Sequence, residues 1–345
     1  MSPLITMILM LNLATGTIIT MSSYHWLLAW MGLELNTLAI LPIISKSHHP
    51  RATEASTKYF LTQAAASALI LFSSLINAQT TGQWNILQLE HPLAQILLTM
   101  ALAMKLGLSP THFWLPEVLQ GSSLKTTLII VTWQKLAPAT ILFLTWNQAS
   151  ALTITTMGIL SVLTGGLGGL NQTQLRKIVA FSSIAHLGWM ATIITKSNKL
   201  ALLSLMIYIM ISTPLMLALI LFYTKTVPDL TTAWTTSPLL TTLTMTTLLS
   251  LGGLPPLTGF LPKWLILEEL LNQNMALPAT LMAMMTLMSL FFYLRLSYSL
   301  SVTITPTPTT TTNKWRMKPN TTTSLLSTAL PLSLMTLPLM PLIKP

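Results

Sequence analysis

The amino-acid sequence predicts an all-α polytopic membrane protein, and two observations indicate this fold class. The chain of 345 residues is 52% hydrophobic and only 7% charged, and its mean hydropathy is +0.68, whereas soluble domains carry about 25% charged residues. Because one crossing of a membrane needs about 20 apolar residues, the apolar runs provide for about 11 transmembrane helices. We therefore expect residues 1–345 to form a single membrane domain.

The expected helices follow one another with short polar, proline-containing or glycine-containing loops between them. Their ranges are 3–20, 24–44, 58–80, 93–120, 124–146, 150–171, 175–195, 199–223, 238–271, 275–299 and 322–343. The segment 46–58 before the third helix is hydrophilic and is expected to be a turn. The Thr/Pro-rich segment 303–312 is expected to be a surface loop before the last helix, because it is poor helix material.

Basic residues divide unequally between the two sides that these ranges define. One side holds ten of them, at positions Lys46, Arg51, Lys58, Lys125, Arg176, Lys177, Lys225, Lys314, Arg316 and Lys318. The other side holds Lys196, Lys199 and Lys344. Because lysine and arginine concentrate in interior loops, we expect the N-terminus inside and the C-terminus outside. The net charge of +10 then reflects membrane topology and predicts no nucleic-acid partner.

The composition also excludes several kinds of site. The chain has no cysteine, which rules out disulfides, thiolate metal sites and ordinary iron–sulfur ligation. It has no glycine-rich loop of a nucleotide-binding type. The glycine-rich run Gly165–Gly169 lies inside an apolar range and predicts tight helix packing.

One stretch occurs twice in the chain. Gly107–Leu119 reads GLSPTHFWLPEVL, and Gly253–Leu265, 146 positions later, reads GLPPLTGFLPKWL. Interior prolines remove helix hydrogen bonds, and a broken helix in a membrane is tolerated only in protein or beside water. Paired breaks of this kind point to a transport site. The copies fall in the fourth and ninth helices, so we expect two five-helix repeats (1–146 and 147–300) of inverted topology, followed by a loop and a C-terminal helix (301–345).

Four ionisable residues are expected deep in the membrane: Glu34, Lys105, Lys135 and Lys263. Each costs about 2.5–3.5 kcal/mol if it faces lipid, so we expect them to pair or to line a hydrated path. Burial disfavours the charged form, and an opposite charge nearby restores it, which makes a buried Lys–Glu pair a switchable proton holder. Ion pairs that only lock the helices together are the alternative.

Two histidines are weaker candidates for proton transfer. His112 lies between the prolines of the first break, and His186 lies in the middle of a helix beside serines. Neutral imidazole could relay protons at either place, and a hydrogen-bonded structural role is the alternative for both.

Four segments resemble the antiporter-like membrane subunits of mitochondrial respiratory complex I. They are Trp30–Pro42, Ser45–Gln63, Ala103–Gly121 and Leu249–Trp264, and the resemblance covers essentially the whole chain. It resembles the shortened animal form, which lacks the first three of fourteen helices. The resemblance implies that Glu34 and Lys105 are the family's Glu–Lys pair and Lys135 its central lysine. It also implies that Lys263 is the lysine after the second broken helix and that His186 belongs to the central polar axis.

The resemblance further implies a proton-translocating module coupled to NADH:ubiquinone electron transfer, with no redox centre in this chain. NADH, FMN, iron–sulfur clusters and ubiquinone would be used elsewhere in the complex. The implied partners are other membrane-arm subunits, accessory subunits and lipids such as cardiolipin. The implied location is the mitochondrial inner membrane, with the N-terminus in the matrix and the C-terminus in the intermembrane space. A free-standing cation/proton antiporter and a purely structural scaffold are the competing hypotheses.

Overall fold

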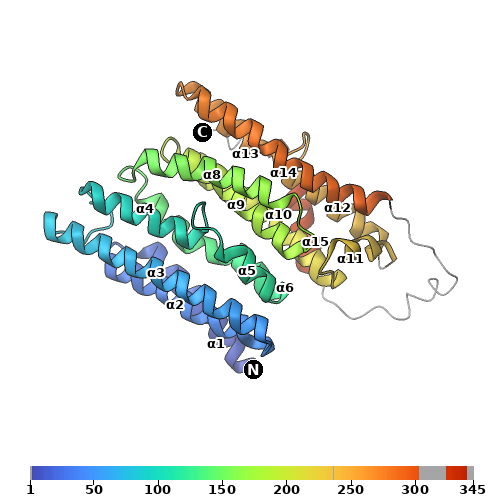
Figure 1. Ribbon diagram of the computed structural model, residues 1–345, viewed down its shortest axis with the longest axis horizontal. Coiled ribbons are helices and arrows are strands. Elements are labelled where there is room, and N and C mark those ends of the chain that lie inside the picture. The colour runs from blue at the N-terminus through green and yellow to red at the C-terminus, as the bar shows by residue number, and fades with distance from the viewer. Residues whose placement is uncertain (1, 236, 303–323, 340–345) are drawn as a thin grey trace.

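The computed structural model describes residues 2–235, 237–302 and 324–339. Apart from two isolated bridges, every regular element among these residues is a helix. Eight of the described helical stretches are long and apolar enough to cross a membrane, and one of them, 124–144, is divided by a 3₁₀ turn. They lie side by side in an elongated bundle (Figure 1). The all-α membrane fold class predicted from the sequence is therefore confirmed.

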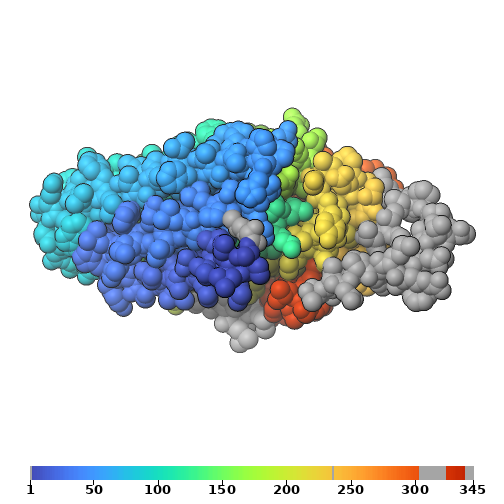
Figure 2. Space-filling model, turned by 90° about the horizontal axis from the view of Figure 1, so that it is seen from below, coloured from blue at the N-terminus to red at the C-terminus, as the bar shows by residue number. Residues whose placement is uncertain are grey.

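The N-terminal part of the bundle contains seven α-helices. They are α1 (Pro3–Ser22), α2 (Trp26–Ile44), α3 (Pro50–Thr81), α4 (Pro92–Leu106), α5 (Trp114–Gly121), α6 (Leu124–Val131) and α7 (Leu136–Leu144). Helices α1 to α3 form much of the face seen in Figure 2. Helix α1 is the least buried of the long helices, with 22% of its apolar window buried, so this face is available to lipid or to other chains.

The C-terminal part contains the remaining helices. They are α8 (Ala151–Gly169), α9 (Leu175–Ile194), α10 (Asn198–Phe222), the short α11 (Val227–Thr231), α12 (Pro238–Gly252), α13 (Phe260–Asn272), α14 (Ala276–Val302) and α15 (Ser324–Leu334). Helix α9 has 83% of its apolar window buried and lies at the centre of the bundle. A capping box begins α11, where the backbone N–H of Thr226 donates to Asp229 over 2.9 Å and lowers the pKa of that carboxyl.

Glycines allow α8 to pack closely on its neighbours, as the run Gly165–Gly169 predicts. A Cβ on Gly165 would lie 2.7 Å from the backbone nitrogen of Ala185 in α9, and a Cβ on Gly169 would lie 2.7 Å from the ring of Phe292 in α14. Since real side chains do not approach so closely, these positions require glycine. The packing interpretation of this run is confirmed.

Three details of the sequence prediction are wrong. Helix α3 begins at Pro50 rather than at residue 58, because His49 caps it and proline suits the first helical position. The helix expected at 124–146 is interrupted between α6 and α7 by the 3₁₀ turn Trp133–Lys135. The described part of the last helix, expected at 322–343, covers only Ser324–Leu334. The segment 303–312 lies outside the described residues.

Candidate functional site

The two repeated stretches break their helices in the same way. Helix α4 ends at Leu106 and is followed by Gly107 with φ +78°, and α12 ends at Gly252 and is followed by Gly253 with φ +80°. Glycine is required at both positions because other residues are strained in this left-handed region. A cis peptide bond precedes the equivalent prolines Pro110 and Pro256. Because each helix ends here, the carbonyls of its last residues, Leu106 and Gly252, have no partner within the helix.

In each copy of the repeated stretch, a lysine donates a hydrogen bond to the carbonyl at the equivalent position. Lys135 Nζ lies 2.6 Å from the carbonyl oxygen of Leu106, and Lys263 Nζ lies 2.8 Å from that of Gly252, which is 146 positions later. The C-terminal end of a helix carries a partial negative charge, so each ammonium group meets a favourable field where lipid would offer none. Both lysines are therefore placed at broken helix ends.

Lys135 itself sits at the unexpected break between α6 and α7. Its side chain is 1% exposed, and its Nζ lies 5.4 Å from the centre of the Trp114 ring. Trp114 in turn donates its indole N–H to the carbonyl of Met104, which also accepts from the backbone N–H of Gly107 at the end of α4. The sequence signal for this break is Pro138, which has no N–H for the carbonyl of Gln134.

Glu34 and Lys105 lie near each other without forming an ion pair. Glu34 is close enough to Lys105 and to Tyr59 for electrostatic interaction. Neither Glu34 Oε2 nor Lys105 Nζ has a hydrogen-bond partner among the described residues, although both atoms are buried. The two residues of the predicted pair are thus neighbours, and one polar atom of each has no hydrogen-bond partner among the described residues.

A small cavity with several polar side chains in its lining lies beside both Lys105 and Lys135. Both lysines line it, together with Leu33, Asn36, Thr37, Tyr59, Gln63, Trp114, Ile130, Gln134, Ala137 and Pro138. Its volume is about 10 Å³, counted over the positions that the centre of a water molecule can occupy, which is room for about one water. The side-chain amides of Asn36 and Gln134 also have buried atoms without partners. Such open donors and acceptors around a water-sized space are the setting in which a buried water is stable.

A second cluster surrounds Lys263 and His186. His186 in α9 lies beside the backbone of Leu251 and the ammonium group of Lys263. Its ring stacks on Tyr208 of α10, with ring centres 5.3 Å apart. Tyr293 of α14 interacts electrostatically with Tyr208. Helices α9, α10, α13 and α14 thus contribute to one polar cluster in the second half.

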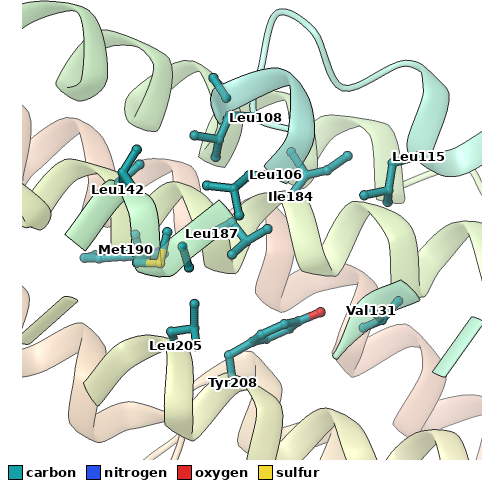
Figure 3. Packing of buried hydrophobic residues seen from close by; sticks show 14 of the residues in the cluster. Leu106, Leu108, Leu115, Val131, Leu142, Ile184, Leu187, Met190, Leu205 and Tyr208 are labelled. Atoms are coloured by element: carbon teal, nitrogen blue, oxygen red, sulfur yellow. The ribbon is translucent and has the colours of Figure 1, made fainter. Parts of the chain in front are cut away.

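Aliphatic side chains lie between the two clusters. In Figure 3, Leu187 of α9 lies between Leu106 and Tyr208, and Ile184 lies beside Leu106; all four belong to the main buried apolar cluster. Leu106 carries the carbonyl bound by Lys135, and Tyr208 stacks on His186. An aliphatic side chain therefore separates these two residues, one of which belongs to each cluster.

His112 is not part of the first cluster. It lies in the loop between α4 and α5, packs on Phe113 with ring centres 4.4 Å apart, and does not line the cavity between the lysines. Sequence reasoning missed several uncharged polar residues that do line a cluster, including Tyr59, Gln134 and Tyr208. No sequence signal distinguishes these from other polar residues on helices. Within the described part of the chain, no group of three His, Asp or Glu residues could hold a metal.

The family models identify the class of protein. The model described as NADH:quinone oxidoreductase/Mrp antiporter, TM, matches residues 23–291, and the model described as NADH dehydrogenase subunit 2 C-terminus matches residues 290–344. The chain belongs to this antiporter-like family of NADH:quinone oxidoreductase membrane subunits. Within it, the chain is 54% identical over 341 residues to NADH-ubiquinone oxidoreductase chain 2 of Latimeria chalumnae, covering 99% of this chain and 98% of that protein. Chain 2 of Xenopus laevis is 53% identical over 342 residues, with 99% of each covered. The resemblance recognised from the motifs is confirmed.

Solved structures share the fold. A chain of respiratory complex I from Thermus thermophilus is 27% identical, with a TM-score of 0.81, and the match covers 97% of this chain and 79% of that one. A chain of the Mrp complex from Dietzia is 18% identical, with a TM-score of 0.75, and the match covers 96% of this chain and 74% of that one. The second likeness supports the fold alone.

Proposed function

We propose that this chain is a proton-translocating membrane subunit of an NADH:quinone oxidoreductase. One observation carries the proposal: in both halves a lysine is bound to the equivalent carbonyl of a broken helix, through Lys135 and Leu106 and through Lys263 and Gly252. Each lysine can hold or release a proton, and its charge is tied to a helix end. Relatives named for NADH-ubiquinone oxidoreductase support the assignment to the complex.

In the first half, the proton would pass from Lys105 to Lys135 through water in the cavity between them. When Glu34 is charged, it favours the charged form of Lys105. When Glu34 is protonated, that attraction is lost and burial favours release of the proton from Lys105. Lys135, when neutral, can accept it and is then stabilised by the carbonyl of Leu106 and the face of Trp114. His186 and Lys263 are proposed as the corresponding proton holders in the second half, and His112 as a group at the first break with a lesser role.

The proposal includes a place in a larger assembly. The chain would work in the mitochondrial inner membrane beside other membrane-arm and accessory subunits, with bound lipid, and with its N-terminus on the matrix side, where the basic loops lie. Energy would come from electron transfer elsewhere in the complex, where NADH, FMN, iron–sulfur clusters and ubiquinone act. No residue of this chain is assigned to a redox centre.

The test is the proton-to-electron ratio of an assembled homologous complex that carries the equivalent of Lys135→Met. NADH oxidation in the presence of an uncoupler and the amount of assembled complex are measured alongside. We expect normal assembly with a lower ratio. The matched control is Lys125→Met, which removes an exposed lysine of the neighbouring helix α6 and should leave the ratio unchanged. An unchanged ratio in Lys135→Met would mean that the buried charges are structural, as in a scaffold.

The free-standing antiporter hypothesis makes a different prediction. The chain purified alone would exchange cations for protons in sealed vesicles under an imposed pH gradient. We expect no such exchange, because the described cavities around Lys105 and Lys135 have room for about one water and not for a hydrated cation.

A further inference from the structure

A hollow in the surface lies at one end of the bundle, outside both lysine clusters. Its volume is about 320 Å³, and it is lined by the start of α3, the end of α5 and Lys177 of α9. The α3–α5 contact is tight here, since a Cβ on Gly121 would lie 2.6 Å from the carbonyl oxygen of Arg51. The position of Arg51 on the rim is therefore fixed by packing.

Positive charge at this hollow is only partly compensated. Lys58 forms ion pairs with both neighbouring carboxylates. Its Nζ lies 2.5 Å from Glu54 Oε1 and 2.6 Å from Glu117 Oε2. The other two cations that line the hollow, Arg51 and Lys177, form no ion pair with a described residue. Three lining cations thus face two carboxylates, which leaves one positive charge without a carboxylate partner.

The basic residues also occupy unfavourable places on their helices. Arg51 is the second residue of α3, and Arg176 and Lys177 are the second and third residues of α9. The N-terminal end of a helix already carries a partial positive charge. Arg51 and Arg176 lie close enough to interact, with like charge, and the buried Nε of Arg176 has no hydrogen-bond partner among the described residues. An anion in the hollow would offset the costs at Arg51 and Lys177, which line it.

An exposed apolar stripe continues from the hollow along α3. Positions 51, 54 and 58 line the hollow, and the same helical spacing continues through 61, 65, 68, 72 and 75 on one face. Leu61 is 66% exposed, Phe72 54% and Leu75 46%. From Leu61 to Leu75 the stripe is about 21 Å long at 1.5 Å per residue. This exceeds the roughly 15 Å that one leaflet contributes to the hydrocarbon core.

We propose that this hollow binds the phosphate group of an anionic phospholipid, whose acyl chains lie along the exposed stripe of α3. Basic pockets between transmembrane helices suit anionic headgroups, and arginine pairs well with phosphate. A free phosphate ion or a water-soluble acidic segment would use the charges of the hollow but would have no use for the apolar stripe. The combination of the two features favours a lipid.

The experiment places the full-length chain in nanodiscs of phosphatidylcholine that contain a trace of photoactivatable phosphatidylglycerol. After illumination, mass spectrometry locates the labelled peptides. We expect label on the α3 stripe between Leu61 and Leu75, and more of it than photoactivatable phosphatidylcholine gives. The double variant Arg51→Gln/Lys177→Gln should bind the anionic lipid about 30-fold more weakly, at about 1 kcal/mol per basic residue.

Two controls separate charge in the hollow from charge in general and from misfolding. The double variant Lys46→Gln/Lys125→Gln removes two exposed basic residues that do not line the hollow and should keep the label. The double variant Arg51→Lys/Lys177→Arg keeps both positive charges and should therefore keep the label on the α3 stripe. Circular dichroism confirms that each variant retains its helices.

Other outcomes would overturn the proposal. Equal labelling by phosphatidylcholine, or full labelling of Arg51→Gln/Lys177→Gln, would show that the hollow does not select an anionic lipid. Loss of the label on addition of inorganic phosphate would identify a free-phosphate site. A carbodiimide cross-link from Lys177 to an acidic residue of a neighbouring subunit, in the native complex, would assign the hollow to a protein contact.

Discussion

Replacing Gly253 with alanine should displace Lys263 as well as strain the backbone. Gly253 has φ +80°, and alanine in the left-handed region costs about 1–2 kcal/mol. The new Cβ would also lie 2.8 Å from Lys263 Nζ and 2.9 Å from its Cδ, so the lysine would have to move away from the carbonyl of Gly252. Loss of a hydrogen bond to a charged donor costs about 1.5–3 kcal/mol. The combined cost is therefore about 2.5–5 kcal/mol.

The equivalent change in the other half is a matched control. Gly107 has φ +78°, so Gly107→Ala carries the same backbone strain, but its Cβ would meet Leu115 and Trp114 and no lysine. We expect both variants to assemble less well in a homologous complex. Per assembled complex, only Gly253→Ala should lower the proton-to-electron ratio. If both variants kept the wild-type ratio, the contact between Lys263 and the helix end would have no part in proton translocation.

Three further predictions concern the two clusters and the packing around them. Glu34→Gln removes the charge that faces Lys105 and should lower the proton-to-electron ratio, whereas the exposed Glu54→Gln should not. Tyr208→Phe keeps the stacking on His186 but removes the hydroxyl, and should slow coupled turnover at normal assembly; unchanged turnover would exclude a role for that hydroxyl. Gly165→Leu overpacks the α8–α9 contact, at about 1–3 kcal/mol or more, and should reduce the band of assembled complex on a native gel.

Strong local signals explain what the sequence could predict. Glycine and proline act on the backbone within a few residues, so the breaks could be predicted within Gly107–Leu119 and Gly253–Leu265. Long apolar runs and rare buried charges are equally local, which is why the fold class and the lysines at these breaks were found without a structure. The family motifs then added the roles expected for Glu34 and Lys105.

Features that depend on tertiary contacts could not be predicted. The break at Lys135 has a weak local signal in Pro138, because an interior proline often bends a helix without ending it. Tyr208 and Gln134 gain their importance only from the side chains that surround them. The hollow at Arg51 and Lys177 brings together residues more than a hundred positions apart, and neither helix alone indicates it.

The two halves place the carbonyl that accepts from a lysine at equivalent positions of the repeat, but they do not place the lysines at equivalent positions. Comparing the repeats aligns Lys263 with Glu117, and Glu117 instead pairs with Lys58 at the surface, over 2.6 Å. The acceptor, however, is fixed by the backbone break, and the donor can come from any element that reaches it: Lys135 lies 29 positions after its carbonyl and Lys263 only 11. Each helix end favours the charged form of its lysine, while burial favours the neutral form. Under the proposed function, a small movement of either helix end would therefore change the proton affinity of its lysine.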